Sequence, residues 1–185
     1  MILSDNAIMN LVRSGDVEVF PPLDEMHLRP VGIRLHLARK ILIPEPGQTV
    51  DPTMPVQLKY NEIEIPEEGY VLEPCSFVLA STYESIRTPK DIVGHLEGRS
   101  TIARLGLAIH CTSGIIDSMY DEPRSIVLEM KNLGVFRIII KYKMPIGMLL
   151  LSKMTCPSQQ SSQDQYRNQT SVVGPNLFFQ PKKIL

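Results

Sequence analysis

The sequence predicts a mainly β domain with two short helices, and two observations carry that prediction. Short apolar runs recur along the chain, for example at residues 17–20, 33–37 and 41–43. Proline, glycine or aspartate interrupts them every few residues, as in Pro44-Glu45-Pro46-Gly47. Many short strands separated by turn residues at such intervals are typical of a β-sandwich or β-barrel.

The elements are expected in the following order. Ser4-Asp5 supplies an N-cap and Ser14-Gly15 a stop signal, so a short amphipathic helix is expected between them. Its apolar positions are Ile8, Met9, Leu11 and Val12. Beyond the three runs above, strands are expected at residues 70–73, 77–80, 107–110, 126–129 and 135–140, with a second helix beginning at Ser100.

Length and composition indicate one soluble domain spanning residues 1–185. The hydrophobic share of 43% and charged share of 21% are ordinary for a globular protein. A formal net charge of −1 argues against a general nucleic-acid binder. The apolar runs are too short to span a membrane, and no secretory signal is visible. The 3 cysteines form no CxxC pair, so reduced thiols and a cytoplasmic protein are expected.

The segment from Gly98 to Gly106 is a candidate anion site. If the chain turns helical at Ser100, the first-turn N–H groups are unpaired and attract anions. Arg99 lies just outside, where a guanidinium can bind two phosphate oxygens, and Arg104 shares a helix face with Ser100. A solvated surface helix with scattered charges explains the segment equally well.

Asp117 and Glu129 are the acids most suited to chemistry. Asp117 follows an apolar pair at an expected strand end, and Glu129 shares a strand face with Val127. A carboxylate on a buried face needs a partner, and Arg104 is a natural one. Spacing alone favours a structural Glu–Arg pair. The alternative is a carboxylate beside a water and a substrate, with its protonation controlled by its surroundings.

His95-Leu96-Glu97 matches half of a zinc-deaminase signature. The second half, P-C-x-x-C, does not follow it, so no zinc or other protein-held metal site is predicted. His95 is expected to be a structural or surface residue.

The chain from about residue 156 is expected to form a mobile C-terminal arm or lid. Residues 157–165 are polar and bury little apolar surface. The tail then regains apolar side chains, among them Tyr166, Val172 and the pair Phe178-Phe179. Composition leaves open whether this tail folds back on its own domain or docks on a neighbouring subunit.

Several segments together resemble one known family. They are residues 98–107, 110–113, 116–117 and 126–132, with the two ends Ile2-Leu3-Ser4-Asp5 and Tyr166-Arg167-Asn168-Gln169. In order and spacing they are similar to the dCTP deaminase branch of the dCTP deaminase/dUTPase superfamily. The resemblance implies a distorted β-barrel or jelly-roll of the dUTPase-like type, which assembles as a homotrimer with active sites between subunits.

The family activity implied is deamination of dCTP to dUTP and ammonia without zinc, with Mg²⁺ carried by the triphosphate. The resemblance makes Glu129 the proton shuttle and Ser100 and Arg104 the residues that hold the water and Glu129. It assigns the triphosphate to Arg99, Ser100, Thr101 and Gln169. It further places Asp117 beside the sugar and the backbone of Thr112 and Ser113 against the pyrimidine.

Some positions differ from the family pattern. Gly32 stands where members commonly carry an aspartate, and a Ser/Gln stretch replaces basic and tyrosine positions before the tail. Two alternatives therefore stay open beside the dCTP deaminase. One is a dUTP pyrophosphatase or a bifunctional enzyme that forms dUMP. The other is a non-catalytic homologue that binds dCTP or dTTP.

Overall fold

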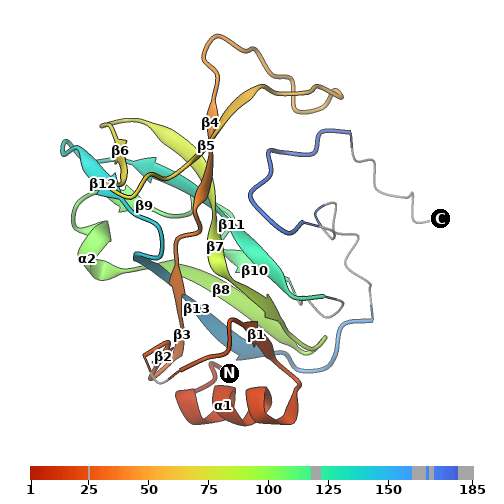
Figure 1. The fold of residues 1–185 in the computed structure, drawn as a ribbon. Helices are drawn as coiled ribbons and strands as arrows, with labels where there is room; N and C mark the ends of the chain where they lie inside the picture. The colour runs from red at the N-terminus through yellow and green to blue at the C-terminus, as the bar shows by residue number, and fades with distance from the viewer. Residues whose placement is uncertain (25, 118–121, 160–165, 167–168, 179–185) are drawn as a thin grey trace.

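The computed structural model describes the chain except for residues 25, 118–121, 160–165, 167–168 and 179–185. The described part is mainly β, as predicted (Figure 1). Its elements are α1 (Asp5–Ser14), β1 (Glu18–Phe20), β2 (Leu28–Arg29), β3 (Gly32–His36), β4 (Lys40–Pro44), β5 (Tyr60–Glu64), β6 (Tyr70–Leu72), β7 (Phe77–Arg87), β8 (Ile92–Gly98), α2 (Ser100–Ala103), β9 (Leu107–Ala108), β10 (Ile115–Ile116), β11 (Arg124–Asn132), β12 (Ile138–Ile140) and β13 (Pro145–Lys153).

The strands form two main antiparallel sheets and one two-stranded ribbon. The first sheet has the order β5-β4-β7-β11-β9, with β1 also paired to β7. The second has the order β10-β8-β13-β3-β2, and β12 pairs with β6. Buried side chains of both main sheets, such as Leu35, Ala80, Leu128 and Leu149, belong to one apolar core. The arrangement is jelly-roll-like, but strand pairing among the described residues does not close it into one barrel.

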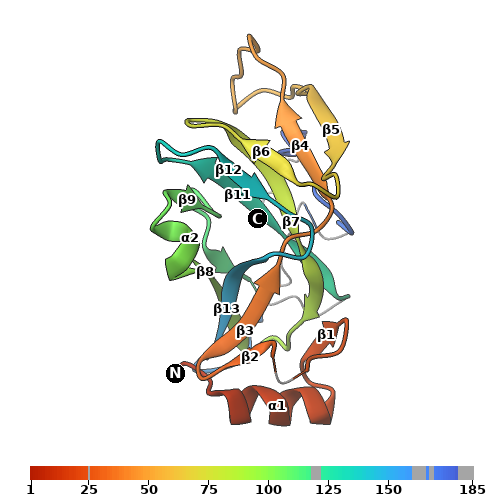
Figure 2. The same ribbon diagram turned by 60° about the vertical axis from the view of Figure 1, so that its left-hand side comes forward.

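The N-terminal helix forms where its capping residues predict it. The Ser4 side chain accepts a hydrogen bond from the Ala7 N–H at 3.4 Å. Gly15 ends the helix with a φ of 78°, and its N–H bonds the Val12 carbonyl. Ile8 is buried, and α1 lies across one end of the molecule in both views (Figures 1 and 2).

Strand lengths differ from the prediction where polar residues lie inside a strand. Strand β7 continues from residue 80 to Arg87 because Thr82 and Glu84, although polar, are buried and hydrogen-bonded. Two other strands are shorter than predicted, since β9 ends at Ala108 and β12 begins only at Ile138. No helix in the described parts of the chain is long and apolar enough to span a membrane.

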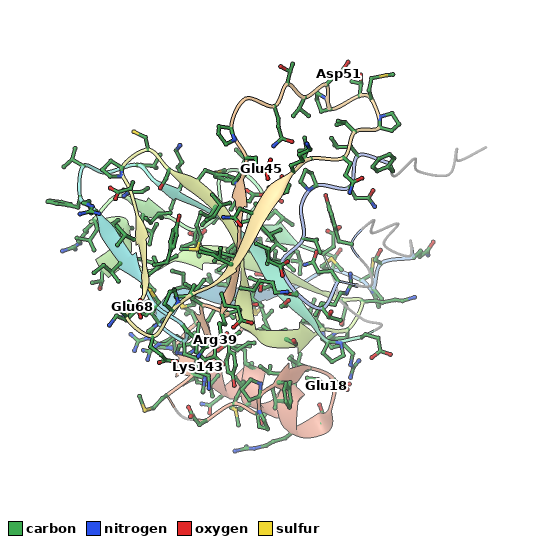
Figure 3. All side chains as sticks on the ribbon, turned by 45° about the horizontal axis from the view of Figure 1, so that its top comes forward. Glu18, Arg39, Glu45, Asp51, Glu68 and Lys143 are labelled. Carbon is green, nitrogen blue, oxygen red and sulfur yellow. The ribbon has the colours of Figure 1, made fainter. Side chains whose placement is uncertain are left out.

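Cation–π contacts connect the β3–β4 turn, the turn before β13 and strand β7. The Arg39 guanidinium lies 4.4 Å from the centre of the Tyr142 ring, and the Lys143 ammonium lies 4.4 Å from that of Tyr83. Figure 3 shows Arg39 and Lys143 close together on one side of the molecule. The β3–β4 turn is thereby tied to the turn before β13.

The described part of the C-terminal tail folds back on its own chain. Val172 is 5% exposed and packs with Leu42 of β4 and Leu79 of β7. Tyr60 and Phe77 extend this small cluster. These residues pack on their own chain, and whether the tail also contacts a neighbouring subunit stays open; Phe179 lies outside the described residues. Phe178 is exposed.

Helix α2 is a single turn between β8 and β9, and its exit depends on glycine. Gly106 has a φ of 88°, and a Cβ there would lie 2.5 Å from the Gly134 nitrogen. The Gly106 carbonyl also accepts from the Leu133 N–H at 2.7 Å. This close approach fixes α2 against the end of β11.

We expect Gly106→Ala to destabilise the protein more than Gly47→Ala. Both glycines have a positive φ, but a Cβ at Gly47 would meet nothing within 4 Å. Each alanine costs about 1 kcal/mol through backbone strain, and the clash with Gly134 adds to that at Gly106 only. Urea unfolding of both variants measures the difference. Equal losses of unfolding free energy would contradict the steric role.

Candidate functional site

A cavity of about 570 Å³ lies where the large sheet meets the C-terminal tail. Its walls come from β7, β11, the segment around β10, Tyr60 of β5, and Tyr166, Gln169 and residues 173–175 of the tail. Four of the side chains predicted from the sequence line it: Ser113, Asp117, Glu129 and Gln169. Residues that lie far apart in the sequence therefore share one concave surface, which is the usual form of a small-molecule site.

Glu129 lies half-buried in the wall of this cavity, and the backbone orients its side chain. The residues at positions 127, 129 and 131 of β11 are half-buried, while those between them are buried, as the alternation of a strand requires. The Cys111 N–H donates to Oε2 of Glu129 at 3.0 Å. One carboxylate oxygen is thus held by the loop that follows β9, and the shared face of Val127 and Glu129 is confirmed.

Asp117 lies directly after β10, at the strand end predicted for it. It is exposed and lines the cavity together with Ser113. Strand β10 is positioned by β8, through the pairs Ile115↔His95 and Ile116↔Gly94. His95 is therefore part of the sheet that supports the site. Thr112 is exposed and does not line the cavity.

The C-terminal tail supplies the remaining polar wall. Gln169 donates from Nε2 to the Ser125 carbonyl at 3.2 Å. The Tyr166 hydroxyl accepts from the Asn176 N–H at 3.1 Å, which bends the tail over itself. Burial raises the pKa of Tyr60, and the nearby Tyr166 adds to that effect. The tail therefore meets β11 by a defined polar contact as well as by Val172.

The candidate residues on and beside α2 lie away from this cavity. Ser100 and Thr101 are exposed, and Arg99 donates from Nη1 to the Pro145 carbonyl at 3.1 Å. Arg104 is exposed at the C-cap of α2. Within the described residues of one chain, no ion pair joins Arg104 to Glu129. Figure 1 shows α2 on the other side of β7 and β11 from the tail.

Sequence reasoning missed two polar residues of the cavity wall, Arg124 and Ser125. Each is 5% exposed, and both line the cavity at the end of β11 remote from Glu129. The Ser125 hydroxyl has no hydrogen-bond partner among the described residues. The apolar run at residues 126–128 predicts the strand but starts two residues too late to include them. Their position before that run was the only signal available.

Comparison with known proteins identifies the family. The model of a family described as dCTP deaminase-like matches residues 2–154. The chain belongs to this family. It is 35% identical over 163 residues to a "dCTP deaminase, dUMP-forming" of Streptomyces coelicolor, covering 86% of this chain and 83% of the relative. It is 33% identical over 165 residues to a "dCTP deaminase" of Natronomonas pharaonis, covering 86% and 84%.

A solved structure shows the same fold. The crystal structure of the 2'-deoxycytidine 5'-triphosphate deaminase from Agrobacterium tumefaciens superposes with a TM-score of 0.63 at 20% sequence identity. The match covers 81% of this chain and 47% of that one, so this chain spans about half the length of the Agrobacterium protein. The predicted dUTPase-like fold class and the family resemblance are confirmed.

Gly32 lies where the structure leaves no room for a side chain. A Cβ at this buried position would lie 2.7 Å from the Leu149 carbonyl oxygen of the neighbouring strand β13. An aspartate there would require β3 and β13 to move apart. The glycine therefore allows the close approach of these two strands.

We expect Glu129→Gln to speed the alkylation of Cys111. Partial burial and the Glu129 charge raise the pKa of the Cys111 thiol, while Lys131 opposes them. Removing the carboxylate lowers this pKa, so more thiolate is present at mildly alkaline pH and the reaction accelerates. Mass spectrometry of iodoacetamide-treated protein measures the rate, with the exposed Cys75 and Cys156 as internal controls. An unchanged rate at Cys111 would contradict this electrostatic coupling.

Proposed function

We propose that this protein is a dCTP deaminase that hydrolyses the C4 amine of dCTP. The observation that carries the proposal is the cavity in which Glu129, Asp117, Ser113 and Gln169 meet, in a chain of the dCTP deaminase-like family. Family membership supports its assignment as an enzyme, a hydrolase acting on a nucleotide. The cavity volume lies within the usual range of small-molecule sites.

Glu129 is proposed to act as base and then as acid. Its Oε2 is held by the Cys111 N–H, which leaves Oε1 to take a proton from the attacking water. After attack at C4, the carboxyl group gives this proton to ring N3. It then takes the proton of the new C4 hydroxyl and passes it to the amine, which leaves as ammonia while C4 becomes a carbonyl. Such proton transfer contributes about 10²–10⁴ in rate. The chemistry requires no zinc, and the absence of a catalytic zinc stays a prediction.

The substrate is proposed to be dCTP with its Mg²⁺. Backbone groups of Thr112 and Ser113 would read the pyrimidine, and Asp117 would contact the sugar. Gln169 lies on the tail, where it can reach the phosphates while the tail excludes water from the reacting base. Burial of a triphosphate also needs cations, and Mg²⁺ supplies part of that charge.

A homotrimer is proposed because the remaining candidate site residues, on and beside α2, lie outside the cavity of their own chain. Arg99, Ser100 and Thr101 would bind the triphosphate of a neighbouring subunit, and Arg104 with Ser100 would hold its Glu129 and water. The position of α2 on the other side of β7 and β11 supports this arrangement (Figure 2). An intersubunit site of this kind needs a heterologous contact that closes into a ring.

Two products are candidates, dUTP and dUMP, because relatives of both names match this chain. Asp117 could position a second water for release of pyrophosphate. Incubation with Mg²⁺ and dCTP, and separately with dUTP, distinguishes the reactions. Ammonia with dUTP supports the simple deaminase, and ammonia with dUMP and pyrophosphate the bifunctional enzyme. Pyrophosphate alone indicates a dUTP pyrophosphatase, and nucleotide binding without turnover contradicts the proposed enzyme.

We expect Glu129→Gln to lower the rate of ammonia release from dCTP by at least about 10²-fold. The amide keeps the shape of the side chain but cannot accept the water proton. Glu64→Gln is the matched control, since Glu64 is an exposed carboxylate of β5 that does not line the cavity. Ammonia assays of both variants measure the effect. Turnover retained by Glu129→Gln would exclude the shuttle.

We expect two inactive variants to complement each other. If Arg104 and Glu129 of one site come from different subunits, co-refolded Arg104→Ala and Glu129→Gln chains regenerate intact sites. Random mixing of equal amounts restores up to about one quarter of the wild-type sites. An intact site needs one chain that keeps Glu129 and a neighbouring chain that keeps Arg104, and each condition is met about half of the time. Each variant refolded alone is the control. Activity that stays at the level of the separate variants would contradict sites between subunits.

A further inference from the structure

A histidine and carboxylate cluster lies away from the cavity. His27 ends a turn between β1 and β2, His36 ends β3, and Glu84 lies within β7. None of the three lines the cavity. Their potential metal-binding atoms all lie within 4.8 Å of one another. Among the described residues, this is the one group of three histidine, cysteine or acidic side chains with such spacing.

Glu84 gives the cluster its charge. Its side chain is fully buried, and both oxygens contact His36, Oε2 through the backbone N–H at 2.8 Å and Oε1 through Nδ1 at 2.6 Å. No lysine or arginine in the described part of the chain pairs with it. A buried carboxylate needs a positive partner. His36 meets this need when its imidazole is protonated, and a metal cation bound beside that imidazole would meet it when the imidazole is neutral.

Both imidazoles are oriented by carboxylates. Nδ1 of His36 contacts Glu84, and Nδ1 of His27 lies 2.6 Å from Oδ1 of Asp24. The two rings meet edge to face, with centres 5.2 Å apart. Asp24 fixes Nδ1 of His27 and leaves Nε2 of that ring available, which is the arrangement that surrounds metal-binding histidines. An ion held by both His36 and Glu84 would replace the hydrogen bond between them.

The turn that carries His27 is fixed before any metal binds. Oδ1 of Asp24 accepts from the N–H groups of Met26 at 2.8 Å and His27 at 3.1 Å. The His27 carbonyl accepts from the Arg34 N–H of β3 at 2.7 Å. Both histidine side chains are 18% exposed, so an ion can reach them from solvent.

We propose that His27, His36 and Glu84 form a binding site for a divalent transition-metal ion of the Zn²⁺ type. Two imidazoles and a carboxylate suit Zn²⁺ better than Mg²⁺ or Ca²⁺, which prefer oxygen ligands. Metal–ligand bonds of about 2.0–2.1 Å place ligands about 3.3 Å apart. The widest separation in the cluster, at most 4.8 Å, would close by up to about 1.5 Å, and the 2.6 Å contact between His36 and Glu84 would open by about 0.7 Å, with water in the fourth position.

The ion would act on the fold and not on the cavity. It would tie the turn at His27 to β3 and β7, and so join the chain before β2 to both main sheets. Because an ion that binds only the folded chain stabilises it, the melting temperature should rise with metal concentration. This site does not depend on the proposed deaminase activity.

The test is a titration of the untagged full-length protein with Co²⁺ and Zn²⁺ after removal of bound metal by a chelator. We expect one Co²⁺ per chain, visible d–d absorption, displacement by Zn²⁺ and a melting temperature several degrees higher with Zn²⁺. His27→Ala and His36→Ala should each weaken Co²⁺ binding at least about tenfold, and Asp24→Asn by about tenfold. His95→Ala, a histidine of β8 outside the cluster, should change nothing.

Three results would overturn the site. They are no stoichiometric Co²⁺ binding by the wild-type chain, unchanged affinity in His27→Ala, or a sulfur-to-cobalt charge-transfer band that disappears on thiol alkylation. The third would assign the ion to the exposed cysteines. Circular dichroism checks that each variant folds. Since loss of His36 leaves Glu84 without its partner, His27→Ala and Asp24→Asn decide the outcome if His36→Ala does not fold.

Discussion

The buried hydroxyl of Thr82 is the contact on which both candidate sites of this molecule depend. It accepts a hydrogen bond from the Ile126 N–H at 2.9 Å and donates to the Glu84 carbonyl at 2.7 Å. The pairing of β11 with β7 shifts register between Ser125 and Val127, where this contact lies. A bulge changes which face later residues occupy. By bonding at this register shift, Thr82 helps determine that the side chains of Val127 and Glu129 lie on the cavity face of β11. It also fixes the part of β7 that carries Glu84.

Local patterns predicted the positions of those residues that depend only on their own strand. Asp117 after an apolar pair and Glu129 beside Val127 both lie on the cavity, because strand alternation is a property of neighbouring residues. The family resemblance added Ser113 and Gln169, which spacing alone does not connect to Glu129. The long β7 was only partly predicted, since burial of Thr82 and Glu84 depends on partners in β11 and β3.

Other features depend on contacts between distant segments, and sequence patterns do not report those. His27, His36 and Glu84 belong to no motif and meet only because β3 and β7 adjoin. Arg124 and Ser125 precede the apolar run that indicates β11, so they read as turn residues. The relation of Arg104 to Glu129 is a different case. The two side chains form no ion pair within one described chain, and in the proposed function they meet only between two subunits.

The docking of Val172 limits how the tail can move. Gln169 reaches the cavity only three residues before a side chain that is packed against Leu42 and Leu79. Exposing a valine costs about 1.5–3 kcal/mol, which leaves the undocked tail roughly 1–10% populated at equilibrium. A nucleotide that enters by this route would therefore meet an open chain only a fraction of the time. Its association rate would fall to that fraction of the rate for a fully open tail. A smaller or more polar residue at position 172 would weaken the docking of the tail and so speed nucleotide entry.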